Sequence, residues 1–155
     1  MKSSKNDFPR VLAQIKQIMK LQGSRDTKLV EICTILKQGI SHYDWVGFYF
    51  ADERNRELII GPYVGEPTEH AHIQFGSGIC GQAAERKETF VVQDVSAEAN
   101  YLACSPLVRS EIVVPIFKKN RIIGELDIDS HTKHPFTSED KEFLERVSEL
   151  ISVLF

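Results

Sequence analysis

The sequence predicts an α+β domain in which a mostly antiparallel sheet carries helices on its faces. Apolar residues recur at helical spacing near both ends of the chain, whereas the middle holds short apolar runs joined in pairs by polar turns. Strands and helices grouped in this way are typical of α+β folds. The 155 residues, 42% of them hydrophobic, are enough for one domain with its own core.

Two helices are expected in residues 1–41. The first begins near Pro9, a residue that fits the first helical turn, and Gly23 can close it. Ser24 can cap the second helix. The apolar positions of the two helices are Leu12, Ile15, Ile18 and Met19 in the first, and Leu29, Cys33, Leu36 and Ile40 in the second. Such stripes face a core or a partner helix.

Two β-hairpins are expected in the middle of the chain. Residues 45–50 and 57–60 flank one polar loop, and residues 112–117 and 122–129 flank another polar turn. Pro115 has no amide hydrogen to donate to a neighbouring strand. We therefore expect it at a bulge or at an edge of the sheet.

Shorter elements connect the hairpins, and a long helix ends the chain. A strand near residues 73–75 leads through a Gly-Ser-Gly turn to a short helix over residues 79–86, and another strand covers residues 89–92. Thr137 and Asp140 can form a capping box at the start of the last helix. Apolar residues then recur at helical spacing to the end of the chain.

These elements predict a single domain over residues 1–155, with helices in 1–41 and the sheet and last helix in 42–155. The chain has 19 Lys and Arg against 22 Asp and Glu, a net charge of −3, which argues against a nucleic-acid partner. The sequence has neither a signal-peptide pattern nor an apolar run of about 18 residues. We therefore expect a cytoplasmic protein without a membrane segment. Three cysteines without a CxxC pair predict free thiols.

The three cysteines differ in their surroundings. Cys33 lies on the apolar stripe of the second helix and is assigned to the core. Cys80 follows a glycine turn at the start of a helix, where the helix dipole can lower a thiol pKa, although plain packing is the commoner role. Cys104 lies in an irregular segment just before a strand, and such loops often carry function. We therefore regard Cys104 as the candidate nucleophile.

One strand is expected to have an acidic face. Alternation places Glu125, Asp127 and Asp129 on one side of residues 122–129 and apolar residues on the other. A solvated surface is one interpretation of the acidic side. A ligand site is the other, because a cationic or proton-donating ligand would relieve the repulsion among the three carboxylates.

Aromatic residues of the first predicted strand are candidates for the walls of such a site. Trp45 and Tyr49 combine an apolar ring with a polar tip, which is common in small-molecule sites. Phe48, by contrast, is assigned to the core. His70 and His72 have no further residues at metal-ligand spacing, so no metal is expected.

Five segments carry a resemblance to a known family. They are 45–49 (WVGFY), 76–81 (GSGICG), 103–104 (AC), 110–115 (SEIVVP) and 126–130 (LDIDS). In this order and with this spacing they resemble the GAF-domain free methionine-(R)-sulfoxide reductases. The resemblance implies a GAF fold, with a six-stranded antiparallel sheet, helices at its back, a ligand cavity at its front and often a homodimer.

The resemblance also implies roles for single residues. Cys104 matches the catalytic thiol of the family, and Cys80 matches a further cysteine. The family's substrate-binding positions are matched by Trp45, Tyr49, Glu111, Asp127 and Asp129. In such enzymes the thiolate attacks the sulfoxide sulfur, and a carboxylic acid, here Glu111 or Asp127, helps to protonate the departing oxygen. Methionine then leaves a cysteine sulfenic acid behind.

The chain departs from the family pattern near the nucleophile. His70 stands where the reductases usually carry the cysteine that resolves the sulfenic acid, and Tyr101 and Ser105 replace a histidine and an acidic residue. Three outcomes remain open. Cys80 resolves the sulfenic acid, an external thiol such as thioredoxin reduces it directly, or the domain binds a ligand without reducing it.

Our first hypothesis is therefore thiol-dependent reduction of free methionine-(R)-sulfoxide without a bound cofactor. The alternative is a non-catalytic GAF sensor that binds a small molecule and reports through the helices of a dimer. A pure dimerisation module is a third interpretation, but it leaves the acidic face unexplained.

Overall fold

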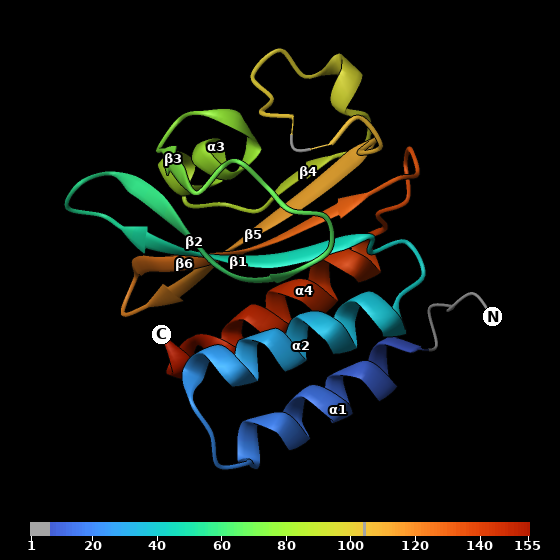
Figure 1. The fold of residues 1–155 in the computed structure, drawn as a ribbon, viewed down its shortest axis with the longest axis vertical. Coiled ribbons are helices and arrows are strands. Elements are labelled where there is room, and N and C mark those ends of the chain that lie inside the picture. Colours follow the sequence, from blue (N-terminus) through green and yellow to red (C-terminus); the bar gives the residue numbers. More distant parts are fainter. Residues whose placement is uncertain (1–6, 104) are drawn as a thin grey trace.

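Six strands form one antiparallel sheet in the order β3-β2-β1-β6-β5-β4 (Figure 1). The structure is a computed structural model that describes residues 7–103 and 105–155, so Cys104 lies outside the described residues. The strands are β1 Trp45–Asp52, β2 Glu57–Val64, β3 His72–Gln74, β4 Phe90–Val92, β5 Ser110–Lys118 and β6 Arg121–Ser130. The predicted α+β class and six-stranded sheet are confirmed.

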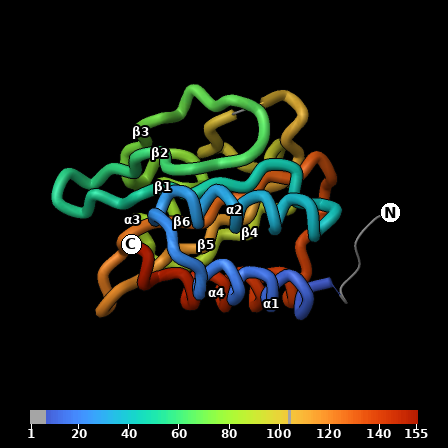
Figure 2. The backbone as a smooth tube through the Cα atoms, turned by 60° about the horizontal axis from the view of Figure 1, so that its bottom comes forward, coloured from blue at the N-terminus to red at the C-terminus, as the bar shows by residue number. Residues whose placement is uncertain are grey.

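Helices cover both faces of the sheet. Three of them, α1 (Asp7–Lys20), α2 (Arg25–Gly39) and α4 (Ser138–Ile151), lie together on one face, which we call the back (Figures 1 and 2). The short helix α3 (Gly78–Arg86) lies on the opposite face, the front. Short 3-10 turns cover Val95–Ala97 and Ser152–Leu154.

The main core lies between the sheet and the three back helices. Strand alternation turns the apolar side chains of β1, β5 and β6 toward these helices. They are Val46, Phe48, Ile112, Val114, Ile116, Leu126 and Ile128. Phe48 is fully buried there, and so is Cys33 of α2, whose pKa is raised by burial. Both residues were assigned to the core from the sequence, and both assignments are confirmed.

The helix ends follow the predicted caps in most places. The Ser24 side chain accepts a hydrogen bond from the Thr27 amide at the start of α2. Thr137 and Asp140 form both hydrogen bonds of a capping box at the start of α4. The first helix differs, because α1 already begins at Asp7 and ends at Lys20, three residues before the glycine that was expected to close it.

Pro115 sits where the sheet tolerates a missing amide donor. Strand β4 pairs with β5 only from Glu111 to Val113, so Pro115 lies beyond this paired stretch. The ladder between β5 and β6 shifts register directly after it, between Ile116 and Phe117. The prediction of an edge position is confirmed, and the bulge lies just beyond Pro115 rather than at it.

A second, smaller core lies between the front of the sheet and α3. Its buried members are Tyr49, Leu58, Ile73, Ile79, Cys80, Ala83, Ala84, Val113 and Ile122. This layer covers the face of β6 that carries the acidic residues. None of the helices in the described part of the chain has the length and apolar character needed to cross a membrane.

Candidate functional site

The acidic residues of β6 form the floor of a buried site on the front of the sheet. Glu125, Asp127 and Asp129 occupy alternate positions, and their exposed fractions are only 0%, 2% and 3%. The interpretation of this side as a solvated surface is therefore wrong. In the ladder, Asp129 stands between Glu111 of β5 and Trp45 of β1, which brings these three predicted site residues together.

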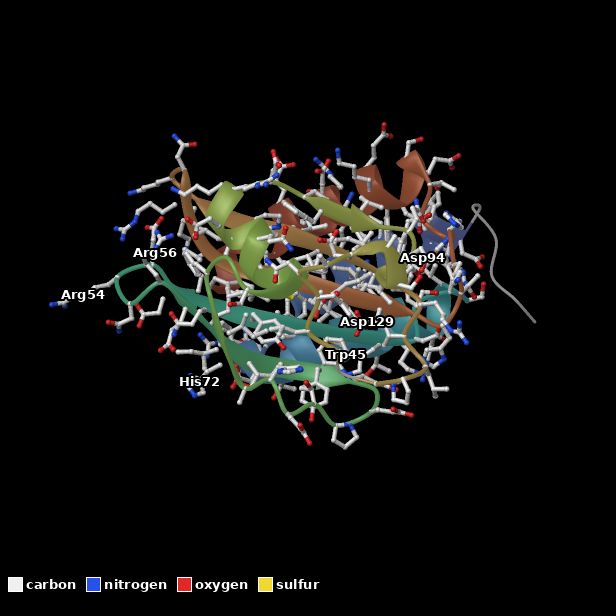
Figure 3. The ribbon with its side chains drawn as sticks, turned by 90° about the horizontal axis from the view of Figure 1, so that it is seen from above. Trp45, Arg54, Arg56, His72, Asp94 and Asp129 are labelled. Atoms are coloured by element: carbon white, nitrogen blue, oxygen red, sulfur yellow. The ribbon has the colours of Figure 1, made fainter. Side chains whose placement is uncertain are left out.

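The two aromatic side chains predicted for this site are held by backbone acceptors. The Trp45 indole Nε1 donates to the Glu66 carbonyl at 2.9 Å. The Tyr49 hydroxyl donates to the His70 carbonyl at 3.1 Å, and Tyr49 pairs with Glu125 across the β1–β6 ladder. In Figure 3, Trp45 and Asp129 lie near the centre of the front face, whereas His72 lies at its margin.

Several carboxylate oxygens of β6 lack a hydrogen-bond partner. Both carboxylate oxygens of Glu125 and Oδ1 of Asp127 and of Asp129 are buried without a partner among the described residues. Burial is the main cause that raises the pKa of all three groups. The charge of Asp127 adds to the effect at the other two. The Cys80 thiol partly offsets the rise at Glu125, and hydrogen bonds with Glu111 and Cys80 partly offset it at Asp127. The environment therefore favours the protonated acids.

Two small cavities open beside this floor. The first, about 10 Å³, is lined by residues that include Tyr49, His70, Cys80, Leu102, Glu111 and Asp127. The second, about 30 Å³, is lined by residues that include Trp45, Glu66, Ser105, Val108 and Asp129. The described site residues predicted from the sequence thus all line one cavity or the other. Leu102 and Ser105, which stand on either side of Cys104 in the sequence, line different cavities.

A family model with the description GAF domain matches residues 24–155. The chain belongs to the GAF domain family. It is 34% identical over 149 residues to GAF domain-containing protein A of Dictyostelium discoideum, with 96% of this chain and 92% of that protein covered. It is also 35% identical over 127 residues to the free methionine-R-sulfoxide reductase of Escherichia coli, with coverage of 81% and 75%.

A solved structure extends the similarity of this GAF domain to three dimensions. It is the free methionine-R-sulfoxide reductase of Neisseria meningitidis in complex with its substrate, with a TM-score of 0.91 and 35% identity. The alignment covers 100% of this chain and 93% of that one. The GAF domain is therefore homologous to the free methionine-R-sulfoxide reductases, as the sequence motifs indicated.

Cys80 of the GAF domain is a buried thiol with a raised pKa. It lies in the first turn of α3, and its Sγ donates to Glu111 Oε2 at 3.7 Å. Burial raises its pKa well above the ordinary value, and the charges of the surrounding carboxylates, Asp127 first, raise it further. The lowering by the helix dipole that the sequence pattern allowed is outweighed here, because desolvation and negative neighbours both oppose the thiolate.

The segment before Cys104 is fixed to α3 by Asn100, a residue that sequence reasoning missed. Asn100 Oδ1 accepts a hydrogen bond from the Gly78 amide at 2.8 Å, and its Nδ2 donates to the Gly76 carbonyl at 2.7 Å. Ser77, at the N-cap, makes no side-chain cap bond, so Asn100 supplies the acceptor instead. Gly78 has a φ of 64°, and a Cβ there would meet Leu102 at 2.8 Å.

His70 also contacts this segment. Its Nε2 lies 3.0 Å from the carbonyl oxygen of Ala103, the residue before Cys104. His70 is thus a neighbour of the segment that carries Cys104, the predicted nucleophile. His72 instead lies 3.6 Å from Glu57 at the margin of the sheet, so the two histidines do not converge.

The sequence indicated neither the complete burial of Glu125 nor a group of residues that could hold a metal ion. Alternation placed Glu125 on the acidic face, but its complete burial beside Asp127 depends on the cover that α3 provides. One ligand atom each from Cys80, Glu111 and Asp127 lies within 4.8 Å of the others. Among the described residues, these three are the group with the geometry to hold a metal ion.

Proposed function

We propose that this GAF domain reduces free methionine-(R)-sulfoxide to methionine with Cys104 as the nucleophile. One observation carries the proposal: buried carboxylate oxygens of Asp127 and Asp129, without partners in the described chain, lie beside Tyr49 and Trp45 around the segment that bears Cys104. The homologous reductases of E. coli and N. meningitidis support it.

The floor and walls of the site suit the two ends of such a substrate. An ammonium group would give the buried oxygen of Asp129 the hydrogen bond and the positive charge that it lacks. The rings of Trp45 and Tyr49 would pack against the methyl group on sulfur. A ligand with both an ammonium group and a methylated sulfur would bind to the carboxylates and to the aromatic rings, whereas an apolar ligand would leave the carboxylates unsatisfied.

The proposed reaction transfers one oxygen atom from the substrate to the enzyme. The Cys104 thiolate attacks the sulfoxide sulfur, the sulfur–oxygen bond of the substrate breaks, and the oxygen remains on Cys104 as a sulfenic acid while methionine leaves. The substrate sulfur is reduced by two electrons, and the cysteine sulfur is oxidised by two. The transferred oxygen needs a proton during this step.

Asp127 is suited to supply that proton, together with Glu111. A carboxyl group donates only in its protonated form, and burial raises the pKa of Asp127. The hydrogen bond that it shares with Glu111 gives the pair a route for exchanging a proton. Asp129, whose pKa is raised as well, takes the substrate ammonium in this proposal.

An external thiol is the proposed reductant of the sulfenic acid. Two thiols convert the sulfenic acid back to Cys104, with release of water and formation of one disulfide outside the protein. Cys80 is the alternative resolving residue, but its buried thiol has a raised pKa, and a thiol attacks as the thiolate. A thioredoxin-like protein or a small dithiol fits the external role.

The size of the cavities adds a requirement to the proposal. A volume of about 10 or 30 Å³ holds little more than one or two water molecules. Methionine sulfoxide is much larger, so the segment between Asn100 and Val108 has to move for the substrate to enter. Leu102 lines the first cavity, and Ser105 and Val108 line the second.

The decisive experiment compares both epimers of free methionine sulfoxide with dithiothreitol and with a thioredoxin system. We expect methionine only from the (R) epimer, none from Cys104→Ser, and full activity from Cys33→Ser, which changes a buried thiol of the back core. Retained turnover in Cys80→Ser would identify the external thiol as reductant. A folded protein that yields no methionine with either reductant would exclude the reductase.

A non-catalytic sensor is the second candidate function. The observation that favours it is His70 in the place of the usual resolving cysteine. A sensor would bind its ligand equally well in Cys104→Ser and produce no methionine. The homodimer and the cytoplasmic location stay predictions, and light scattering with size-exclusion chromatography tests the first.

A further inference from the structure

A buried thiol and two buried carboxylates converge under α3. One ligand atom each from Cys80, Glu111 and Asp127 lies within 4.8 Å of the others. The Sγ of Cys80 and Oε2 of Glu111 are 3.7 Å apart. Ligand atoms of a tetrahedral zinc ion lie about 3.3–3.5 Å apart, given zinc–sulfur and zinc–oxygen bonds of about 2.3 and 2.0 Å. Small side-chain rotations would therefore complete such a geometry.

Glu125 gives an independent indication that this region is built for a cation. Its side chain is fully buried, and both of its carboxylate oxygens are without a partner among residues 7–103 and 105–155. It lies two residues before Asp127 on the same face of β6. The family resemblance gives this residue no substrate contact, so a buried carboxyl remains whose oxygens the substrate proposal does not use.

The adjoining cavity has the dimensions of an ion rather than of an amino acid. Its volume is about 10 Å³, close to the space that one water molecule occupies, and Cys80, Glu111 and Asp127 all line it. A metal ion fits this space without the segment movement that methionine sulfoxide requires.

We propose that Cys80, Glu111 and Asp127 bind a divalent transition-metal ion of the zinc type, with Glu125 as an additional carboxylate behind them. A thiolate with carboxylates is a donor set that zinc accepts, whereas magnesium and calcium prefer oxygen alone. The ion displaces the proton of the Cys80 thiol and that of any protonated carboxyl, so protons are released on binding. No change of oxidation state is involved.

Metal and substrate would compete for the same carboxylates. Glu111 and Asp127 are substrate-binding residues in the proposed reductase, and an ion held by them blocks the site. This consequence rests on the proposed function, whereas metal binding itself does not. The GAF domain would then be a reductase that zinc inhibits reversibly and a chelator restores.

Cobalt(II) tests the site without any enzymatic assay. A cobalt–thiolate bond gives a charge-transfer absorption in the near ultraviolet that carboxylate ligation alone does not give. We expect this band on anaerobic titration of the wild type, of Cys33→Ser and of Cys104→Ser. We expect Cys80→Ser to lose this band. Loss of an outer-sphere partner lowers metal affinity roughly 10- to 100-fold, and the zinc affinity of Cys80→Ser should fall by more than that.

Each other outcome overturns the proposal. A folded wild type that shows no band at a large excess of cobalt has no thiolate site. A band that persists in Cys80→Ser and disappears in Cys104→Ser belongs to the wrong cysteine. If Cys80→Ser does not fold, Asp127→Asn takes its place, because it keeps the thiol and removes one ligand; affinity equal to that of the wild type would then refute the site.

Competition between the metal ion and the substrate is measured separately. Free methionine-(R)-sulfoxide added to the cobalt-loaded protein should reduce the band, and the (S) epimer should not. If the protein shows the band but never produces methionine, the proposed function fails and the metal site stands. If the protein turns over substrate but shows no band, the metal site fails and the proposed function stands.

Discussion

Buried carboxylates occur on both sides of the sheet, and they differ in how they are satisfied. Asp140, at the start of α4 on the back, accepts from the Tyr43 hydroxyl at 2.7 Å and from the Thr137 amide at 2.8 Å, and its Oδ1 lies 2.7 Å from His42 Nε2. On the front, both oxygens of Glu125 are without partners in the described chain, as are single oxygens of its two neighbours on β6.

The pKa values follow this difference. Burial alone would raise the pKa of Asp140, but hydrogen bonds from His42, Thr137 and Tyr43 outweigh it and hold the pKa below its ordinary value. On the front, burial is not outweighed, and the pKa of Glu125 is raised. A carboxylate that the fold itself satisfies stabilises the fold, whereas one left unsatisfied is available to a ligand.

The largest expected effect comes from a change to the carboxylates on the front of the sheet. Asp127→Asn removes an acid that we assign to proton donation and substrate binding, so kcat/KM for methionine-(R)-sulfoxide should fall about 10²- to 10⁴-fold. The free energy of unfolding should not fall, because the lost carboxyl is a buried, under-satisfied group. Methionine production and urea unfolding measure the two quantities. Asp26→Asn, at an exposed position of α2, is the control for activity and should leave kcat/KM unchanged.

Asp140→Ala is expected to give the opposite pattern. It removes one half of the α4 capping box and leaves the Tyr43 hydroxyl and the His42 ring without their acceptor. We expect the free energy of unfolding to fall by about 2–4 kcal/mol, with kcat/KM unchanged in the folded protein. Urea denaturation measures the first, and activity below the transition measures the second. An equal loss of activity in folded protein would mean that the two faces are coupled.

The fold could be predicted from sequence because its signals are local. Short apolar runs flank polar turns in both hairpins, and the Thr137–Asp140 box is contained in four residues. Pro115 lacks an amide donor whatever its surroundings. The helix expected from Pro9 begins at Asp7 in the structure.

The site could be predicted only in part. Alternation placed Asp127 and Asp129 on one face, residue chemistry indicated Trp45 and Tyr49, and the family motifs added Glu111. Whether that face is buried depends on α3 and on the segment before Cys104, which pack over it from elsewhere in the chain. Asn100 was missed for the same reason, since its partners Gly76 and Gly78 lie more than twenty residues away. Local patterns do not report contacts at that distance.

The two groups should give opposite pH dependences of stability. The folded pKa of Asp140 lies below its unfolded value of about 3.9, so its stabilisation is present above that pH and is lost as the pH falls through the folded pKa. The folded pKa of Glu125 lies above its unfolded value of about 4.3. Its folded form binds the proton more tightly, so stability declines as the pH rises above that value, by up to about 1.4 kcal/mol per pH unit.

Variants of Glu125 and of Asp140 separate the two pH dependences of stability. In the presence of a chelator, Glu125→Gln should flatten the decline of the urea midpoint above pH of about 4.5, and Asp140→Asn should flatten the loss at lower pH. A Glu125→Gln profile that parallels the wild type throughout would mean that Glu125 does not titrate differently in the folded and unfolded states.

Tyr43→Phe is the smallest expected effect and the finest test of the comparison. The ring stays in the back core, and only the hydroxyl that donates to Asp140 Oδ1 is removed. Asp140 keeps its other donors, so the free energy of unfolding should fall by only about 1 kcal/mol. Tyr63→Phe, which removes a hydroxyl from a half-buried ring of β2, is the control.

A double-mutant cycle then shows whether Asp140 is the reason for that loss. In an Asp140→Ala background, Tyr43→Phe should cost less than it does alone, with a coupling energy of about 0.5–1 kcal/mol. Additive costs would show that the hydroxyl stabilises the protein through some other contact. The back carboxylate would then be less well satisfied than its geometry indicates, and the contrast with the front of the sheet would rest on the pKa values alone.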